Sequence, residues 1–168
     1  MRTRTDALIK IRPIIPDDRE PLKTILENTG VFSDAEIHVA LELIDAVLGD
    51  PVSDDYNIRV AVDEDQTILG YYCVGPTPLT ASTYDLYWIA VRPAVHSRGI
   101  GSQLLADAER FVSSRGGVLM LAETSSQPKY ENTRQFYIRN QYAEIARIKN
   151  YYKIDDDLVV YGKYLSQY

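Results

Sequence analysis

The sequence predicts a mixed α/β fold, in which one central sheet contains parallel and antiparallel strands and has helices on both faces. Hydrophobic periodicity alternates between the strand and helix patterns in the order β-α-α-β-β-β-α-β-α-β-β. In the middle of the chain an apolar strand, a helix and a second apolar strand form a crossover, a connection that is right-handed and joins parallel strands in nearly all proteins. The outer strands can pair as antiparallel hairpins.

The first third of the chain predicts one strand and two helices. The strand covers 8–12, and the first helix runs from an acidic cap at 16–18 to Gly30. Ser33 and Glu36 have the spacing of a capping box, which marks the start of the second helix. Apolar residues then recur at helical spacing until a Gly-Asp-Pro stop.

The middle of the chain predicts three strands. The segments 58–62 and 67–74 are joined by a polar turn at 63–66, and a third apolar run covers 84–91. The single cysteine, Cys73, lies inside the second of these strands. We therefore expect it to be a buried small residue and not a nucleophile.

The last part of the chain predicts alternating helices and strands. A left-handed residue is expected at Asn140, and the three aspartates at 155–157 are expected to form a solvated turn. The predicted segments are a helix at 102–115, a strand at 118–122, a helix at 127–139, and strands at 143–148 and 158–165.

Length and composition limit the class of protein. With 168 residues, 45% of them hydrophobic and 25% charged, the whole chain (1–168) is expected to be one globular domain. The net charge of −6 is unlike the basic surface that nucleic-acid binding requires. One cysteine excludes an intramolecular disulfide, and two histidines give little support for a metal site.

The amino-terminal ten residues include basic residues but no apolar signal core, and no run reaches transmembrane length. We therefore expect a cytoplasmic protein with no nucleic-acid or membrane partner. A homodimer is left open.

The segment between the third central strand and the next helix is suited to phosphate. Glycines at 99 and 101 allow close backbone approach, the following helix start offers unpaired N–H groups, and Arg98 adds a cation. A dinucleotide-binding fingerprint would need a third glycine where Leu104 stands, and a Walker A loop would need Gly-Lys-Ser/Thr where Ser102 follows Gly101. Both nucleotide interpretations fail.

The run His96-Ser97-Arg98-Gly99-Ile100-Gly101 resembles the pyrophosphate loop of the GNAT superfamily of acetyl-CoA-dependent N-acetyltransferases. That loop usually reads Gln/Arg-x-x-Gly-x-Gly/Ala, so His96 departs from it. The resemblance implies a GNAT acyltransferase fold and acetyl-CoA as co-substrate, with no metal. The implied cofactor segment consists of Ile89, Ala90, Val91, His96, Ser97, Arg98, Gly99, Ile100, Gly101 and Ser102, together with Asn132 and Tyr137.

The helix predicted at 127–139 carries the second part of this resemblance. GNAT enzymes present an asparagine and, five residues later, a tyrosine after a strand that splays from its neighbour to admit the pantetheine arm. Here these residues are Asn132 and Tyr137. The resemblance implies that Asn132 binds the cofactor arm and that the Tyr137 hydroxyl faces the CoA sulfur.

Acetyl transfer requires an oxyanion donor, an acid and a base. A backbone N–H at a bulge near 89–91 can hold the oxyanion, and Tyr137 can protonate the departing thiolate. Glu123, at the predicted carboxyl end of its strand, is the candidate base, with Asp85 and Glu131 as weaker rivals.

The sequence thus predicts an N-acetyltransferase that acts on a primary amine of a small molecule, such as an amino acid, a polyamine or an amine antibiotic, within a ternary complex. Two alternatives stay open. One is a non-catalytic acyl-CoA sensor, and the other is an enzyme that acetylates protein amino termini or lysines.

Overall fold

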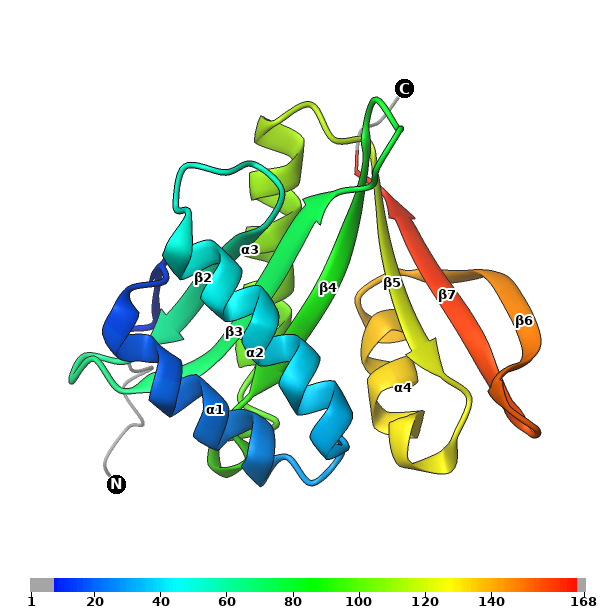
Figure 1. The fold of residues 1–168 in the computed structure, drawn as a ribbon, viewed down its shortest axis with the longest axis horizontal. Helices are drawn as coiled ribbons and strands as arrows, with labels where there is room; N and C mark the ends of the chain where they lie inside the picture. Colours follow the sequence, from blue (N-terminus) through cyan, green and yellow to red (C-terminus); the bar gives the residue numbers. More distant parts are fainter. Residues whose placement is uncertain (1–7, 166–168) are drawn as a thin grey trace, which may run out of the picture.

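The computed structural model describes residues 8–165 and contains one seven-stranded sheet in the order β1-β2-β3-β4-β5-β7-β6 (Figure 1). The strands are β1 (Lys10–Pro13), β2 (Asn57–Val62), β3 (Ile68–Pro76), β4 (Thr83–Val91), β5 (Leu119–Ser125), β6 (Ala143–Lys153) and β7 (Asp156–Tyr164). Only β4 and β5 pair in parallel, and all other neighbours are antiparallel. The predicted mixed sheet is confirmed.

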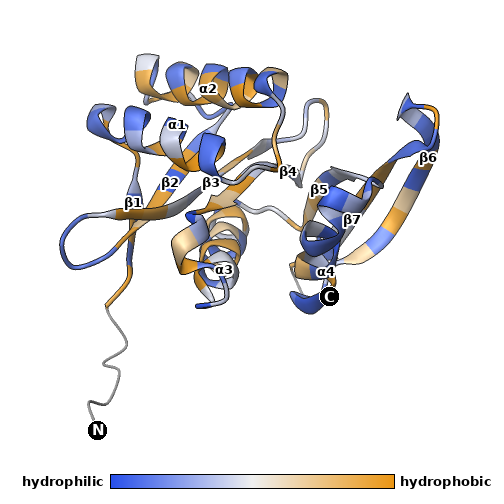
Figure 2. Cartoon of the chain, turned by 90° about the horizontal axis from the view of Figure 1, so that it is seen from below, coloured by the Kyte–Doolittle hydropathy of each residue, from blue (hydrophilic) through white to orange (hydrophobic). Residues whose placement is uncertain are grey.

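Helices cover both faces of the sheet, as expected. The helices α1 (Arg19–Asn28) and α2 (Asp34–Gly49) lie on one face, whereas α3 (Ile100–Ser114) and α4 (Glu131–Arg139) lie on the other (Figure 2). Short 3₁₀ turns precede three of the helices, at η1 (Pro16–Asp18), η2 (Pro93–Val95) and η3 (Pro128–Tyr130). The predicted helices at 16–30 and 127–139 therefore each begin with a 3₁₀ turn.

The sheet separates two hydrophobic cores because successive side chains of a strand point to opposite faces. The core on the α1/α2 side contains Leu22, Ile44 and Tyr71, and Cys73 is fully buried there as expected. Burial raises the pKa of the Cys73 thiol to about 12, which keeps it protonated. The core on the α3/α4 side contains Leu104, Met120 and Tyr137.

Strand β5 differs from its prediction in a way that matters for the site. It extends to Ser125 and not to residue 122, because its last residues continue to pair with β7, for example Glu123 with Val160. Its pairing with β4 covers only three residue pairs, which begin at Thr83↔Leu119 and end at Asp85↔Leu121. Beyond these pairs β4 stays hydrogen-bonded to β3 and β5 stays hydrogen-bonded to β7, so β4 and β5 diverge (Figure 1).

Two expectations about the carboxyl-terminal part are wrong. Asn140 has φ −93°, and the left-handed residue is Gln141, because the chain turns one residue later to enter β6. Asp156 does not lie in a solvated turn, since β7 begins there and its side chain is buried. Its carboxylate accepts hydrogen bonds from Ser125 Oγ and Gln127 Nε2, which anchor the end of β5.

None of the helices within residues 8–165 is long and apolar enough to cross a bilayer. The expectation about the amino-terminal ten residues falls mostly on residues 1–7, which lie outside the described part of the chain.

Candidate active site

The bulge in β4 lies at Tyr87 and not at 89–91 as the sequence suggested. Cys73 of β3 pairs with Trp88, and the next residue, Val74, pairs with Leu86, so Tyr87 is the extra residue. Tyr87 and Trp88 consequently both pack on the α1/α2 side, although they are consecutive. The residues Ile89, Ala90 and Val91 pair regularly with β3, but none of them has a partner on β5.

The loop after β4 is fixed by contacts with its own strand and with the start of β3. The backbone N–H of Arg92 donates to the carbonyl of Leu69 (2.7 Å), and Arg92 Nε donates to the carbonyl of Ile68 (2.9 Å). Nε2 of His96 lies 2.8 Å from the carbonyl oxygen of Val91, so His96 fastens the loop to the last residue of β4. This gives His96 a structural role at the position where the family loop usually has Gln or Arg.

The backbone after His96 forms a concave row of amides. Ser97 (φ 65°) and Gly99 (φ 76°) are both left-handed, and α3 begins at Ile100. The N–H groups of residues 97–102 donate to no acceptor within residues 8–165, and the first amide that does is that of Gln103, which binds the carbonyl of Gly99. Six neighbouring amides at a helix start are suited to an anion, because their N–H dipoles and the helix dipole act together.

The two glycines of this loop serve different purposes. A Cβ at Gly99 would meet no atom within 4 Å, so glycine is favoured there by its positive φ alone. A Cβ at Gly101 would lie 3.0 Å from the Phe136 ring, so glycine there allows α3 to approach α4 closely. Arg98 is exposed and makes no ion pair with another described residue.

Of the two residues predicted on α4, only Tyr137 is buried. Its ring stacks on Tyr161 of β7 with centroids 5.6 Å apart and contacts Tyr142 and Phe136. Its hydroxyl makes no hydrogen bond to a described residue, and burial raises the pKa of this phenol above its usual value. Asn132, near the start of α4, is exposed. The two residues lie five positions apart, which places them on different sides of the helix.

Glu123 lies in the half of β5 that β4 leaves unpaired. Burial, followed by the nearby charge of Asp85, raises the pKa of its carboxyl. The Tyr87 phenol belongs to the same group: burial, Asp85 and, more weakly, Glu123 raise its pKa to about 12. Asp85 itself accepts a hydrogen bond of 2.7 Å from Thr77 Oγ1. The structure therefore brings the bulge residue Tyr87 together with Asp85 and Glu123. No cation contributes to the pKa of Glu123.

Glu131, the other rival base, is separate from this group. It is exposed and binds Gln135 and Arg134, and these contacts lower the pKa of its carboxyl. Arg134 also donates to the carbonyls of Ser125 (2.7 Å) and Gln127 (2.9 Å), so it ties α4 to the end of β5.

A contact that the sequence did not predict joins the two faces of the sheet at the wide end of the diverging strands. The Tyr130 hydroxyl donates to Glu36 Oε1, and Lys129 Nζ donates to the carbonyl of Val31 (3.0 Å). The loop between α1 and α2 is thereby linked to the segment after β5. The only sequence signal was the capping box of Glu36, whose other carboxylate oxygen does accept from the Ser33 amide.

Tyr152 of β6 was also missed as part of this region. Burial and then the charges of Glu123, Tyr151, Asp156 and Glu36 raise the pKa of its phenol. Three carboxylates from β5, β7 and α2 therefore act on this one hydroxyl.

A cavity of about 230 Å³ adjoins the amide row. Its lining residues are Ser102, Ala106 and Glu109 of α3, Arg139, Asn140 and Gln141 after α4, and Lys163 of β7. Within residues 8–165, histidine, cysteine, aspartate and glutamate nowhere form a group of three that could hold a metal ion.

Comparison with solved structures shows the same architecture over nearly the whole chain. A protein of Desulfovibrio desulfuricans that is assigned to the GNAT acetyltransferase family is 38% identical in sequence to this chain, with a TM-score of 0.90. The match covers 95% of this chain and all of that one. An aminoglycoside 6′-N-acetyltransferase complexed with coenzyme A is 18% identical (TM-score 0.75; 95% and 98% covered). The ribosomal-protein-S18-alanine N-acetyltransferase of Escherichia coli is 15% identical (TM-score 0.72; 96% of each chain covered).

A search of curated proteins found no significant match. The family model for the acetyltransferase (GNAT) domain matches residues 54–144, which span β4, the amide row, α3, β5 and α4. This match and the 38% identity over 95% of the chain show that the protein belongs to the GNAT acetyltransferase family.

Proposed function

We propose that this acetyltransferase transfers the acetyl group of acetyl-CoA to a primary amine of a small molecule, by direct attack within a ternary complex. The observation that carries the proposal is the row of six amides at 97–102 that have no acceptor among the described residues, located after the end of β4 that is not paired with β5. A pyrophosphate matches that row in charge, and amides suffice to bind it in a chain with a net charge of −6.

The proposed donor segment keeps the residues predicted from the sequence. Residues 97–102 bind the pyrophosphate through their amides, and His96 holds the loop against Val91. The amides of β4 beyond Asp85 that face away from β3 have no strand partner, so one of them within 86–91 can hold the developing oxyanion of the thioester carbonyl. Asn132 is proposed to bind the pantetheine arm.

Two side chains are proposed to move protons. As the amine nitrogen bonds to the acetyl carbon, the carbon–sulfur bond breaks and the thiolate takes the phenolic proton of Tyr137. The raised pKa of Tyr137 keeps that proton in place at neutral pH. Glu123 accepts a proton from the ammonium group of the acceptor, directly or through water, so that the neutral amine can attack the acetyl carbon. Its raised pKa brings the carboxylate closer to the pKa that a general base needs.

Two features support a small cationic acceptor. The contacts of Tyr130 with Glu36 and of Lys129 with Val31 bridge the wide end of the diverging strands, which favours a compact acceptor over a long peptide. The carboxylates of Glu36, Glu123 and Asp156 act together on Tyr152, so the potential around this hydroxyl favours a positively charged group. Enzymes with this fold are named for acceptors as different as aminoglycosides and a ribosomal protein, so the fold leaves the acceptor class open.

Domain organisation, location and partners are proposed as the sequence predicts them. The chain is proposed to work as one domain in the cytoplasm, where acetyl-CoA is available, without a nucleic-acid or membrane partner. Its oligomeric state, including a homodimer, is to be measured in solution.

The function is tested by incubating the protein with acetyl-CoA and a panel of primary amines while free thiol is measured. The panel contains amino acids, polyamines, aminoglycosides and a peptide with a free amino terminus. We expect thiol release with at least one small amine. Tight coenzyme A binding without turnover of any amine would instead identify an acyl-CoA sensor, and turnover of the peptide alone would identify a protein acetyltransferase.

Replacing Gly99 with valine should weaken coenzyme A binding at least about tenfold, because a β-branched residue resists the positive φ that aligns the amides. Gly116→Val is the matched control, since Gly116 also has a positive φ (80°) and open space around its Cβ position, but lies after α3. Both variants should lose similar folding stability, on the order of 1–3 kcal/mol. Isothermal titration with coenzyme A checks the prediction, and equal binding by the two variants would contradict it.

Tyr137→Phe should lower kcat by about 100-fold and leave the KM for acetyl-CoA nearly unchanged, because only the acid proton is lost. The variant should fold normally, since the hydroxyl has no hydrogen-bond partner among the described residues. Tyr161→Phe, which alters the ring stacked on Tyr137, is the control and should retain activity. An unchanged kcat in Tyr137→Phe refutes the role of this residue as the acid.

The pH profile identifies the base. If Glu123 accepts the proton, kcat/KM falls as pH drops through its raised pKa, and Glu123→Gln removes that limb together with most of the activity. Asp85→Asn removes the negative charge that helps to raise the pKa of Glu123, so the acid limb should move to lower pH. A large loss of kcat in Asp85→Asn without such a shift would assign the base to Asp85.

A further inference from the structure

A second pocket, of about 210 Å³, lies beside the paired part of β4 and β5, because Tyr84 of its lining pairs with Met120 there. It is formed by the segment before β2, the end of β3, the start of β4 and the end of α3. The lining residues that matter here are Asp54, Asn57, Pro76, Tyr84, Phe111 and Arg115. Nothing in the acetyl-transfer proposal uses this pocket.

One ion pair provides both charges at the rim of the pocket. Nη1 of Arg115 lies 2.8 Å from Oδ1 of Asp54, and the side chains are 46% and 81% exposed, respectively. An exposed pair of this kind contributes little to stability, so a ligand can replace it at small cost. The guanidinium is already oriented, because its carbon lies 4.9 Å from the centre of the Phe111 ring.

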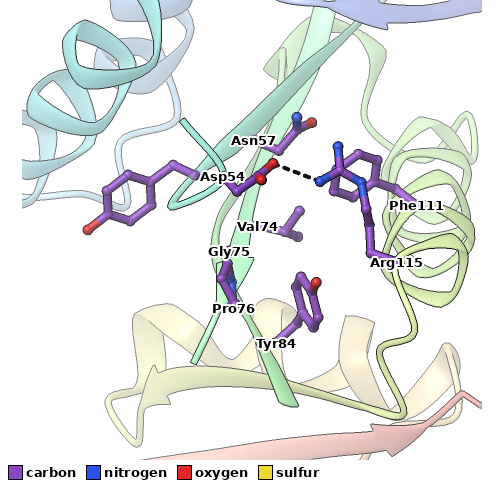
Figure 3. A pocket seen from close by; sticks show the side chains of 9 residues that line it. Asp54, Asn57, Val74, Gly75, Pro76, Tyr84, Phe111 and Arg115 are labelled. Atoms are coloured by element: carbon purple, nitrogen blue, oxygen red, sulfur yellow. Dashed lines mark hydrogen bonds and ion pairs between the residues drawn. The ribbon is translucent and has the colours of Figure 1, made fainter. Parts of the chain in front are cut away.

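The rest of the pocket combines apolar walls with unused hydrogen-bonding groups. The Phe111 ring and Pro76 form apolar walls, and Val74 lies between the ion pair and the Tyr84 ring (Figure 3). The Tyr84 hydroxyl and the Asn57 amide make no hydrogen bond to another described residue. Such a site suits a small ligand with a polar end and an apolar end.

Charge balance selects the kind of polar end. A ligand with only a carboxylate would bring a second negative charge beside Asp54, and a ligand with only an amine would bring a second positive charge beside Arg115. A zwitterion that enters the pair satisfies both side chains, since its carboxylate can bind the guanidinium and its ammonium can bind the aspartate. We propose that this pocket binds a small apolar α-amino acid, such as leucine, with its side chain against Phe111 and Pro76.

The proposal does not depend on the acetyl-transfer chemistry. Tyr84 pairs with Met120 where β4 and β5 are still hydrogen-bonded, whereas the proposed transfer site begins beyond Asp85. Binding should therefore have the same affinity with and without coenzyme A.

Isothermal titration of the full chain with L-leucine, with and without coenzyme A, tests the proposal. We expect one molecule bound per chain, with Arg115→Gln and Asp54→Asn each weakening binding at least about tenfold. Arg110→Gln is the matched control, because Arg110 is an exposed arginine of the same helix that lies outside the pocket, and it should bind leucine normally. Thermal melting should show all three variants folded, since the replaced side chains are exposed.

Two analogues test the charge argument directly. Both 4-methylpentanoate, which lacks the ammonium, and 3-methylbutylamine, which lacks the carboxylate, should bind at least about tenfold more weakly than leucine. Absence of leucine binding, leucine binding that survives Arg115→Gln, or an analogue that binds as tightly as leucine would each overturn the proposal. If leucine bound as an acetyl acceptor at the transfer site, its binding would survive Arg115→Gln. This variant therefore distinguishes the pocket from the transfer site.

Discussion

The short parallel contact between β4 and β5 is the constraint on which the rest of the structure depends. Three residue pairs hold the strands together, and beyond them each strand has a different neighbour. Because β4 is held by β3 and β5 by β7 along their remaining length, neither can close the space between them. Backbone groups on the facing edges are thereby left without strand partners, which a folded protein tolerates only where another group or water can bind them.

The row of amides at the start of α3 follows from the same arrangement. The loop leaves the end of β4, is fixed by Arg92 and His96, and turns at Gly99 into the helix. No side chain caps this helix, whereas the capping box of Ser33 and Glu36 satisfies the start of α2. The two helix starts therefore differ chemically: the amides of α2 are capped by its own residues, whereas those of α3 stay available to a ligand or to water.

Burial accounts for the perturbed groups of the site. Tyr137 is surrounded by other tyrosine rings, and the Glu123 carboxyl, although the residue is exposed, is partly desolvated and lies near Asp85, so the charged forms of both are disfavoured. The aromatic residues around Tyr137 thus do more than fill the core, because they keep water from its hydroxyl and so raise the pKa of the phenol. The second pocket lies outside this set, and its charges are exposed and paired.

The sequence by itself determined the order of elements, the mixed sheet and the loop that we propose binds phosphate. Each of these depends on local patterns: hydrophobic periodicity, capping residues such as Ser33, and the spacing of Gly99 and Gly101. Where pairing with a distant strand decided the outcome, local patterns failed. The end of β5, the start of β7 at Asp156 and the bulge at Tyr87 all depend on the register between strands.

Only the tertiary structure decided which side chains meet at the site. Glu36 and Tyr130 are separated by 94 positions in the sequence, and the charge of Asp85 reaches Glu123 only because β4 and β5 are neighbours in the sheet. The sequence identified Glu123 and Tyr137 as candidates because residue type and spacing are local properties. It could not show their burial or the charges around them, because these depend on how distant segments pack.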